Sequence, residues 1–304
     1  MITLKKLAGK ASFQLVKFIL FMTKVSPVKL SFAICSCTAS LASGLRWKRK
    51  TIALNNLKIV FPELTEKKRR SIFRESLRNM LKNYFEVAFM ANGKYTGKKI
   101  SELASVNGLE HLDRVIKMDK GALLYSGHFG NFAFMVIWLA IKGYPVASIY
   151  KEANNFPNEF FGNIMRKFNV VPLKYKSDAS LTVAIIRALK EKKIVLIQND
   201  QSHPHGIYVN FFNKSVPSLP GPALLAKRVG VPIIPAYVRR EKNNHHLITV
   251  LPEIPLQQED DHKKFMLVNT QIQIDWIARV LKKYPTEWLW LHNRWKRARN
   301  TDNP

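Results

Sequence analysis

The spacing of hydrophobic residues changes about one third of the way along the chain. Residues 65–91 carry apolar side chains at three- and four-residue intervals, which is typical of one long amphipathic helix. Further on, short apolar runs of strand length alternate with helical patterns, which predicts an α/β domain with a helix-covered sheet. The predicted strands are 121–125, 145–150, 169–173, 194–198, 231–238 and 246–252, and the predicted helices are 132–141, 156–168, 180–192, 219–229 and 264–284.

The uncharged stretch from Gly121 to Ile141 has the length of a membrane-spanning helix, but its pattern argues against one. It begins with an apolar run of strand length and ends with an apolar run of helical length. Between them, residues 126–131 are polar and interrupted by two glycines. We therefore predict a buried strand, a turn and a buried helix.

The N-terminal region is basic and contains no acidic residue before Glu63. Its uncharged run from Leu30 to Leu45 is shorter than the ~20 residues that a membrane-spanning helix needs. We expect residues 8–46 to form helices that lie in the membrane interface, with their lysines extended toward water. A single membrane span is the alternative. The predicted domains are therefore a basic membrane-anchoring segment at 1–50 and an α/β domain at 51–304.

The net charge indicates an anionic partner or surface, because 49 Lys and Arg face 21 Asp and Glu, giving +28. Zinc-finger, RNA-binding and heptad-linked basic patterns are absent, and many lysines interrupt apolar stretches. An anionic membrane surface is therefore expected, and nucleic acid is not. Cys35 and Cys37, the only cysteines, exclude a disulfide framework and a four-cysteine zinc site.

His128 is the strongest single candidate for catalysis. It lies in the turn Ser126–Asn131, whose glycines permit close approach of the backbone. The helix that follows offers free N–H groups to an oxyanion. A histidine in this setting suits a general base. The alternative is a histidine that caps a helix or satisfies a buried carbonyl group.

Six sequence motifs occur in the same order as in a known family, over residues 45–298. They are Asn55–Leu57 with Phe61–Glu63, Ser126–Asn131, Gln198–Gln201, Val209–Phe212, Gly221–Ala226 followed by Val231–Pro235, and Trp288–Lys296. By these motifs the chain resembles the bacterial lipid A biosynthesis acyltransferases, of the broader lysophospholipid acyltransferase type. The resemblance implies a mixed β-sheet of the glycerolipid-acyltransferase type, preceded by membrane-associated helices.

The resemblance also implies an activity, partners and a location. The reaction would transfer a fatty acyl group from an acyl carrier protein or acyl-CoA to a hydroxyl of a lipid A precursor or related glycolipid. It would take place at the cytoplasmic face of the inner membrane, without a metal or other cofactor. A basic enzyme suits an acidic carrier protein. In the family, a histidine takes the acceptor's proton, and an acid four residues later orients that histidine.

This chain departs from the family pattern at the acid position, where it has Ala133. Asp200 is the first candidate to replace the acid, because parallel strand ends converge on one crevice. Glu152 and Glu159 come next. The family carries an aspartate at the position of Asp200 in addition to its own acid, so the presence of Asp200 alone indicates no replacement. A second departure is Glu287, which is shifted by one position from the glutamate expected after Pro285.

Residues expected to bind substrate cluster in three loops. The backbone of the histidine turn would stabilise the oxyanion. The loop after the second strand and the helix after it would bind a phosphate or the acyl carbonyl, although a solvated loop and helix surface explain these side chains equally well. The substrate-binding candidates are Gly130, Asn131, Lys151, Asn155, Arg166, Asp200 and Gln201.

Three functions are thus compatible with the sequence. The first is the acyltransferase with His128 as general base. The second is a degenerate relative that binds an acyl carrier or glycolipid without turnover, because Ala133 leaves the pair incomplete. The third is a basic peripheral membrane-binding module, which has no need of the histidine turn. A carboxylate within hydrogen-bonding distance of His128 would favour the first.

The tryptophans near the C-terminus and the arginines around them are expected in different environments. Trp288 and Trp290 alternate in an extended run, which predicts two core residues beneath the sheet. The arginines, Arg294 among them, are expected at the lipid interface.

Overall fold

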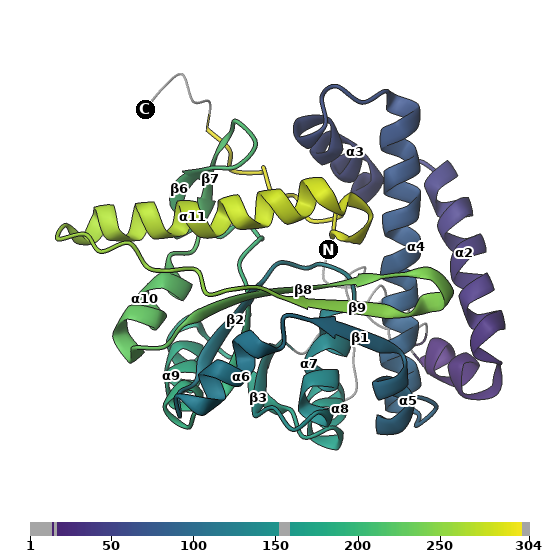
Figure 1. Ribbon diagram of the computed structural model, residues 1–304. Helices are drawn as coiled ribbons and strands as arrows, with labels where there is room; N and C mark the ends of the chain where they lie inside the picture. The colour runs from purple at the N-terminus through teal and green to yellow at the C-terminus, as the bar shows by residue number, and fades with distance from the viewer. Residues whose placement is uncertain (1–13, 15–16, 152–158, 300–304) are drawn as a thin grey trace.

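A seven-stranded mixed sheet forms the centre of the molecule in the computed structural model, which describes residues 14, 17–151 and 159–299 (Figure 1). The strand order is β1-β9-β8-β2-β5-β3-β4, and all neighbours are parallel except β8 and β9. The predicted α/β class is confirmed. The strands are β1 (Ala104–Asn107), β2 (Ala122–Ser126), β3 (Val146–Tyr150), β4 (Val171–Lys174), β5 (Ile194–Gln198), β8 (Ile233–Arg240) and β9 (His246–Val250).

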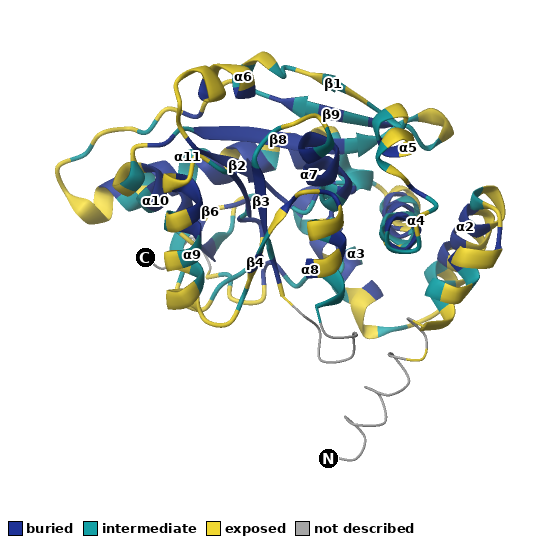
Figure 2. Cartoon of the chain, turned by 90° about the horizontal axis from the view of Figure 1, so that it is seen from below, coloured by how far each residue is buried: buried dark blue, intermediate teal, exposed yellow. Residues whose placement is uncertain are grey.

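Alternate residues of the central strands pack into two hydrophobic clusters, one on each face of the sheet. On β2, Leu123 and Tyr125 belong to one cluster, whereas Ala122 and Leu124 belong to the other. The first cluster includes α9 (Asp178–Lys190), α10 (Gly221–Val229) and α11 (His262–Lys283). The second includes α5 (Gly97–Glu102), α6 (Glu110–Lys117), α7 (Phe132–Ile141) and α8 (Phe160–Lys167). Figure 2 shows the central strands and α7 as the most completely buried elements.

All six strands expected from the hydrophobic pattern are present, with ends shifted by about two residues at most. The pattern missed β1 and the antiparallel hairpin of β6 (Ile207–Asn210) and β7 (Ser215–Ser218). Each of these strands has only four residues, and β1 lies at the edge of the sheet with half of its side chains exposed. Such short, partly polar strands give almost no periodic signal.

The N-terminal region is helical, and its helices pack on the long helix α4 (Glu66–Ala91). Residues 17–25 are helical, and α2 (Val28–Gly44) and α3 (Lys48–Val60) follow. Figure 1 shows α2 alongside α4. Among the described residues, no single helix is long and apolar enough to cross a membrane, and α2 and α3 meet that criterion only as a pair bent by 82°. The predicted domain boundary at residue 50 falls inside α3, so no break in the chain marks it, and it stays a prediction.

The outer side of α2 exposes apolar side chains in a row. Leu30, Ile34 and Leu41 of α2 and Leu45, the residue directly after it, recur at helical spacing and are 51%, 36%, 73% and 65% exposed. Four exposed apolar side chains on one side of a helix make a candidate interaction surface. We call these four residues the α2 apolar row.

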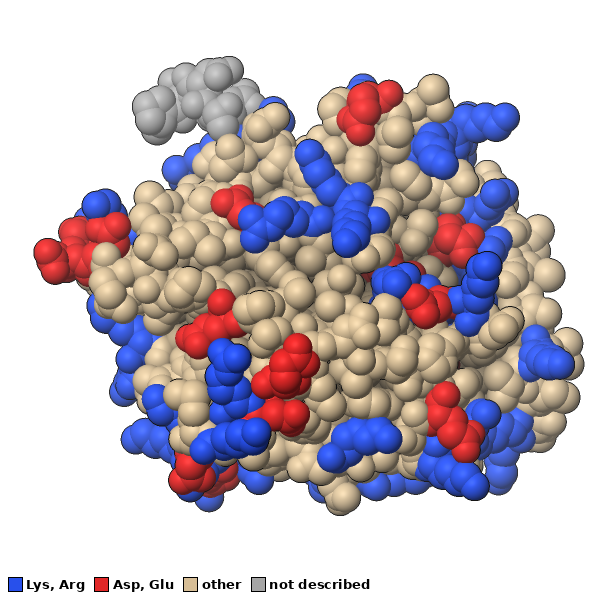
Figure 3. Space-filling model, in the orientation of Figure 1, with Lys and Arg blue, Asp and Glu red and all other residues tan. Residues whose placement is uncertain are grey.

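Basic side chains are scattered over the surface. Figure 3 shows lysines and arginines over the whole visible face, with acidic side chains between them. The excess charge therefore does not by itself mark one docking site on this face.

The C-terminal segment confirms the tryptophan prediction and corrects the arginine one. Trp288 and Trp290 are 2% and 1% exposed. Arg294 is fully buried, so its expected place at the lipid interface is wrong. Its guanidinium donates to the Pro217 carbonyl at 2.7 Å and to the Ser218 hydroxyl, whereas its Nε–H has no hydrogen-bond partner among the described residues.

Candidate active site

Two neighbouring parallel strands place His128 beside Asp200. Strands β2 and β5 pair with Ser126 opposite Gln198, the last residue of each strand. The pairing continues for one more bond, because Asn199 N–H donates to the Ser126 carbonyl at 3.1 Å. His128 lies two residues after the end of β2, and Asp200 lies two residues after the end of β5. The register of the sheet therefore brings together two residues that are 72 positions apart.

Two glycines allow the turn to take this shape. At Gly127, a Cβ atom would lie 3.1 Å from Asp200 Oδ2, so a side chain here would press against the carboxylate. Gly130 has φ of +52°, and a Cβ there would lie 2.2 Å from the Val238 carbonyl oxygen. Only glycine fits both requirements at position 130.

Asp200 holds His128 at two points and is itself held by Trp288. Its Oδ1 lies 2.6 Å from His128 Nδ1, and its Oδ2 accepts the His128 backbone N–H at 2.8 Å. Trp288 Nε1–H donates to the same Oδ2 at 2.7 Å. The carboxylate is 2% exposed and the imidazole 21% exposed. Asp200 is thus a fixed acceptor, while part of the imidazole stays open to a ligand.

The pKa values of the pair assign the proton to the histidine. Burial would raise the pKa of Asp200, but the interaction with His128 and the hydrogen bonds to the carboxylate lower it to about 2. For His128, burial favours the neutral ring, but the charge and hydrogen bond of Asp200 outweigh it and raise the pKa. An ionised Asp200 can only accept, so Nδ1 carries the proton in the neutral ring. Nε2 is then free to act as a base.

Activity is expected to fall as the pH is lowered through the pKa of His128. Only the neutral imidazole accepts a proton, and Asp200 raises this pKa above its ordinary value of 6.5. The acidic limb of kcat/KM should therefore have its midpoint above 6.5. In Asp200→Asn, burial acts without the opposing charge and the pKa should fall, which an NMR titration of the His128 ring measures without turnover. An unchanged pKa would contradict the assignment.

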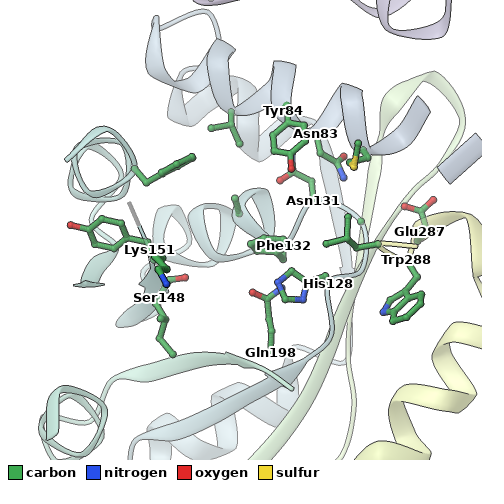
Figure 4. A pocket seen from close by; sticks show the side chains of 18 of the residues that line it. Asn83, Tyr84, His128, Asn131, Phe132, Ser148, Lys151, Gln198, Glu287 and Trp288 are labelled. Atoms are coloured by element: carbon green, nitrogen blue, oxygen red, sulfur yellow. The ribbon is translucent and has the colours of Figure 1, made fainter. Parts of the chain in front are cut away.

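A cavity of about 330 Å³ opens in front of His128 (Figure 4). Its walls come from α4, the first turn of α7, the end of β3, α8 and residues 287–289. Figure 4 shows Asn83 and Tyr84 across from His128, with Lys151 on another wall. A mostly apolar cavity with a few polar groups is typical of a site for a small-molecule ligand. The apolar lining includes Met80, Val87, Phe132, Ile149, Phe161 and Met165.

The structure brings some of the expected substrate-binding residues to His128 and keeps others away. Lys151 lines the cavity, with its Nζ 4.8 Å from the centre of the Tyr175 ring. Gln201 Nε2 lies 3.3 Å from His128 Nε2. Arg166 is not among the cavity-lining residues and donates to Glu159 and Asn163 instead. Asn155 and Glu152 lie outside the described residues.

Gly130 and Asn131 lie at the cavity, but hydrogen bonds inside the protein occupy several of their groups. Gly130 N–H donates to the Glu287 carbonyl at 2.8 Å. Asn131 Oδ1 accepts from Phe134 N–H at 3.0 Å and so caps α7, while its Nδ2 donates to Glu86. Their expected role in binding substrate stays a prediction.

Sequence reasoning missed two residues that shape the site. Trp288 was expected only in the core, yet its indole N–H also fixes Asp200. Glu287 lines the cavity, and its buried Oε2 has no hydrogen-bond partner among the described residues. Burial raises the pKa of Glu287 to about 7. The shift of this glutamate from its expected place after Pro285 was the only signal that pointed to it.

Restoring an acid at position 133 is expected to give no gain. Ala133 lines the cavity on the first turn of α7, and His128 Nδ1 is already paired with Asp200. Ala133→Glu should therefore leave kcat unchanged or lower it, because the added side chain fills part of the cavity. Ala133→Gln is the matched control for size. A gain of about 10-fold or more with glutamate alone would show that Asp200 does not orient the histidine.

Together, the α/β sheet, the paired histidine and carboxylate and the apolar cavity define an enzyme site for proton transfer to or from a bound substrate. Comparison with known proteins identifies the family. The model of the bacterial lipid A biosynthesis acyltransferases matches residues 5–297, so the chain belongs to this family. It is therefore an acyltransferase, and the predicted enzymatic class is confirmed.

Individual relatives are distant. The lipid A biosynthesis lauroyltransferase of Escherichia coli is 22% identical over 294 residues, 91% of this chain and 89% of its own length. The phosphatidylinositol mannoside acyltransferase of Mycolicibacterium smegmatis is 24% identical, over 70% of this chain and 68% of its own length. The crystal structure of the 1-acyl-sn-glycerophosphate acyltransferase of Thermotoga maritima is 14% identical, with a TM-score of 0.40, and covers 86% of this chain and 100% of that one.

Proposed function

We propose that the protein transfers a fatty acyl group from an acyl-carrier thioester to a hydroxyl of a lipid A precursor or a related glycolipid. The observation that carries this proposal is the His128–Asp200 pair at the wall of a mostly apolar cavity. The family supports acyl transfer, and the names of the relatives support a glycolipid acceptor. Both an acyl carrier protein and acyl-CoA present the thioester that this chemistry requires.

In the mechanism that we propose, His128 Nε2 removes the proton of the acceptor hydroxyl as its oxygen attacks the thioester carbonyl. The new C–O bond gives a tetrahedral intermediate, whose negative oxygen is stabilised by N–H groups of the first turn of α7. Phe132 and Ala133 of that turn line the cavity. The C–S bond then breaks, and the departing thiolate takes the proton from His128. Asp200 stabilises the imidazolium between the two steps.

The side chain of Gln201 must move away from His128 before the reaction can begin. Its amide lies within hydrogen-bonding distance of His128 Nε2, the atom that must receive the acceptor's proton. The acceptor hydroxyl therefore displaces this amide when it binds. Gln201 is exposed, so its side chain has room to move aside.

We place the reaction at the cytoplasmic face of the inner membrane. The α2 apolar row supports this location, since its exposed leucines and isoleucine suit the acyl region of a lipid leaflet. Lys24, Lys29 and Arg46 flank the row and are exposed, which suits anionic headgroups. The glycolipid acceptor would then reach the cavity from the membrane, and the donor thioester from the cytoplasm.

Membrane binding is expected to weaken when the α2 apolar row is made polar. Leu41→Glu with Leu45→Glu places two carboxylates on the surface that we assign to lipid, so binding to phosphatidylglycerol vesicles in flotation assays should fall at least 10-fold. Leu267→Glu, an exposed leucine on α11, is the matched control. Equal binding by both variants would contradict the assignment of this surface.

The activity is tested with purified full-length protein in vesicles. Lauroyl and myristoyl thioesters of acyl carrier protein and of coenzyme A are each supplied with a lipid A precursor, and free thiol and acylated product are measured. We expect thiol release that depends on the acceptor. Release without any acceptor would indicate a thioesterase, and no release with any pair of substrates would contradict acyl transfer.

A further inference from the structure

A buried ion cluster lies behind the histidine turn and has no role in the mechanism above. Its centre is Glu86 of α4, whose side chain is fully buried. Arg240 at the end of β8 donates to both carboxylate oxygens, at 2.7 and 2.8 Å. His246 Nε2, on the neighbouring strand β9, lies 3.1 Å from each oxygen. One carboxylate thus connects a helix and two strands of the sheet.

The cluster reaches the catalytic turn through Asn131. Asn131 Nδ2 donates to Glu86 Oε2 at 2.8 Å, and its Oδ1 caps α7. Asn131 is 3% exposed and lies three residues after His128 in the same turn. The far end of the turn is therefore attached to α4 through one side chain, while the near end is attached to Asp200.

The cluster also holds Asn83, which lies one turn before Glu86 on α4 and belongs to the opposite wall of the cavity. Arg240 Nη2 donates to Asn83 Oδ1 at 2.7 Å, and Asn83 lines the cavity across from His128 (Figure 4). A continuous chain of hydrogen bonds thus runs from Asn83 through Arg240 and Glu86 to Asn131. It joins the two walls between which a substrate would bind.

The electrostatics fix Glu86 as a charged acceptor. Burial alone would raise its pKa, but His246 and Arg240 lower the pKa well below its ordinary value. For His246, burial outweighs the attraction of Glu86 and lowers the pKa, while Nε2 stays within hydrogen-bonding distance of both carboxylate oxygens. The lowered pKa favours the charged carboxylate, which accepts the hydrogen bond from Asn131.

We infer that Glu86 is a positioning residue, which holds the His128 turn at a fixed distance from the Asn83 wall through Asn131 and Arg240. This inference rests on the proposed function, since it concerns the geometry of the same site. A catalytic base displaced by about 1 Å loses on the order of 100-fold in rate. A rigid link between the two walls prevents such a displacement.

The test uses Asn131→Ser, because Glu86→Gln would leave Arg240 buried without a carboxylate and risks misfolding. Serine still caps α7, but it is too short to reach Glu86. The ion cluster itself stays paired. The matched control is Asn269→Ser in α11, since Asn269 is 1% exposed and bonded to Gln257 and Phe265 away from the cavity.

We expect Asn131→Ser to lower kcat by about 10- to 100-fold with KM nearly unchanged. Asn269→Ser should keep the kcat of the wild type, although both variants melt a few degrees earlier. In ¹⁵N-histidine NMR spectra, the downfield proton between His128 Nδ1 and Asp200 should shift or broaden in Asn131→Ser only.

An unchanged kcat and an unchanged proton signal in Asn131→Ser would overturn the inference. Equal losses in both variants would also overturn it, because they would reflect stability alone. The NMR measurement requires no turnover, so it decides the inference even if no acyl acceptor is found. Absence of turnover in the wild type would instead count against the proposed function.

Discussion

Asp200→Asn is expected to lower kcat by about 10⁴-fold. Asparagine has the same size, but its amide can donate to His128 Nδ1 and so favours the wrong tautomer, with the proton on Nε2. The loss of the same interaction in serine hydrolases sets this magnitude. The effect should be confined to kcat, because Asp200 is buried behind His128 and is not among the cavity-lining residues. Thiol release under saturating substrate measures it.

The control for this substitution is Asp275→Asn on the exposed side of α11, which should keep wild-type activity. Thermal unfolding of Asp200→Asn separates a tautomer effect from misfolding, since the hydrogen bond from Trp288 can still form to the amide oxygen. A loss smaller than about 10-fold would mean that His128 needs no carboxylate.

His128→Ala is expected to reduce acyl transfer to the background rate, a loss of roughly 10⁴- to 10⁶-fold by analogy with other histidine bases. Alanine removes both the proton acceptor for the hydroxyl and the proton donor for the thiolate. Binding of the acyl thioester should persist, since most of the cavity wall is unchanged. Thiol release and a separate binding assay with a non-hydrolysable thioester analogue measure the two effects.

The double variant His128→Ala with Asp200→Asn should be no slower than His128→Ala alone, because residues that act as a unit lose their effect together. His262→Ala, at the exposed start of α11, is the control for the loss of a histidine. Additive losses in the double variant would assign Asp200 a function independent of His128.

Much of the fold could be predicted from the hydrophobic pattern. Strands β2 and β5 are continuous apolar runs that end at polar loops, so their bounds could be read almost to the residue. The nearness of His128 and Asp200 also followed from a general property of parallel sheets, namely that strand ends meet at one edge. The pattern could not give the register of β2 against β5, on which the 2.6 Å contact depends.

The supporting residues could not be predicted in the same way. Glu86 lies 154 and 160 positions before Arg240 and His246, and each of the three looks locally like an ordinary polar residue. Their contact depends on the antiparallel pairing of β8 with β9 and on where α4 crosses the sheet. Arg294 was misplaced for the same reason, because its acceptors lie on the distant hairpin strand β7.

The histidine and its carboxylate lie in two loops that follow neighbouring strands, which affects how such enzymes are recognised. A genome search that requires an acid four residues after the histidine would reject this chain at Ala133. A search that instead scores an aspartate two residues beyond the neighbouring strand would retain it. Sequences that lack the local acid can therefore be re-examined by strand register before they are set aside as inactive.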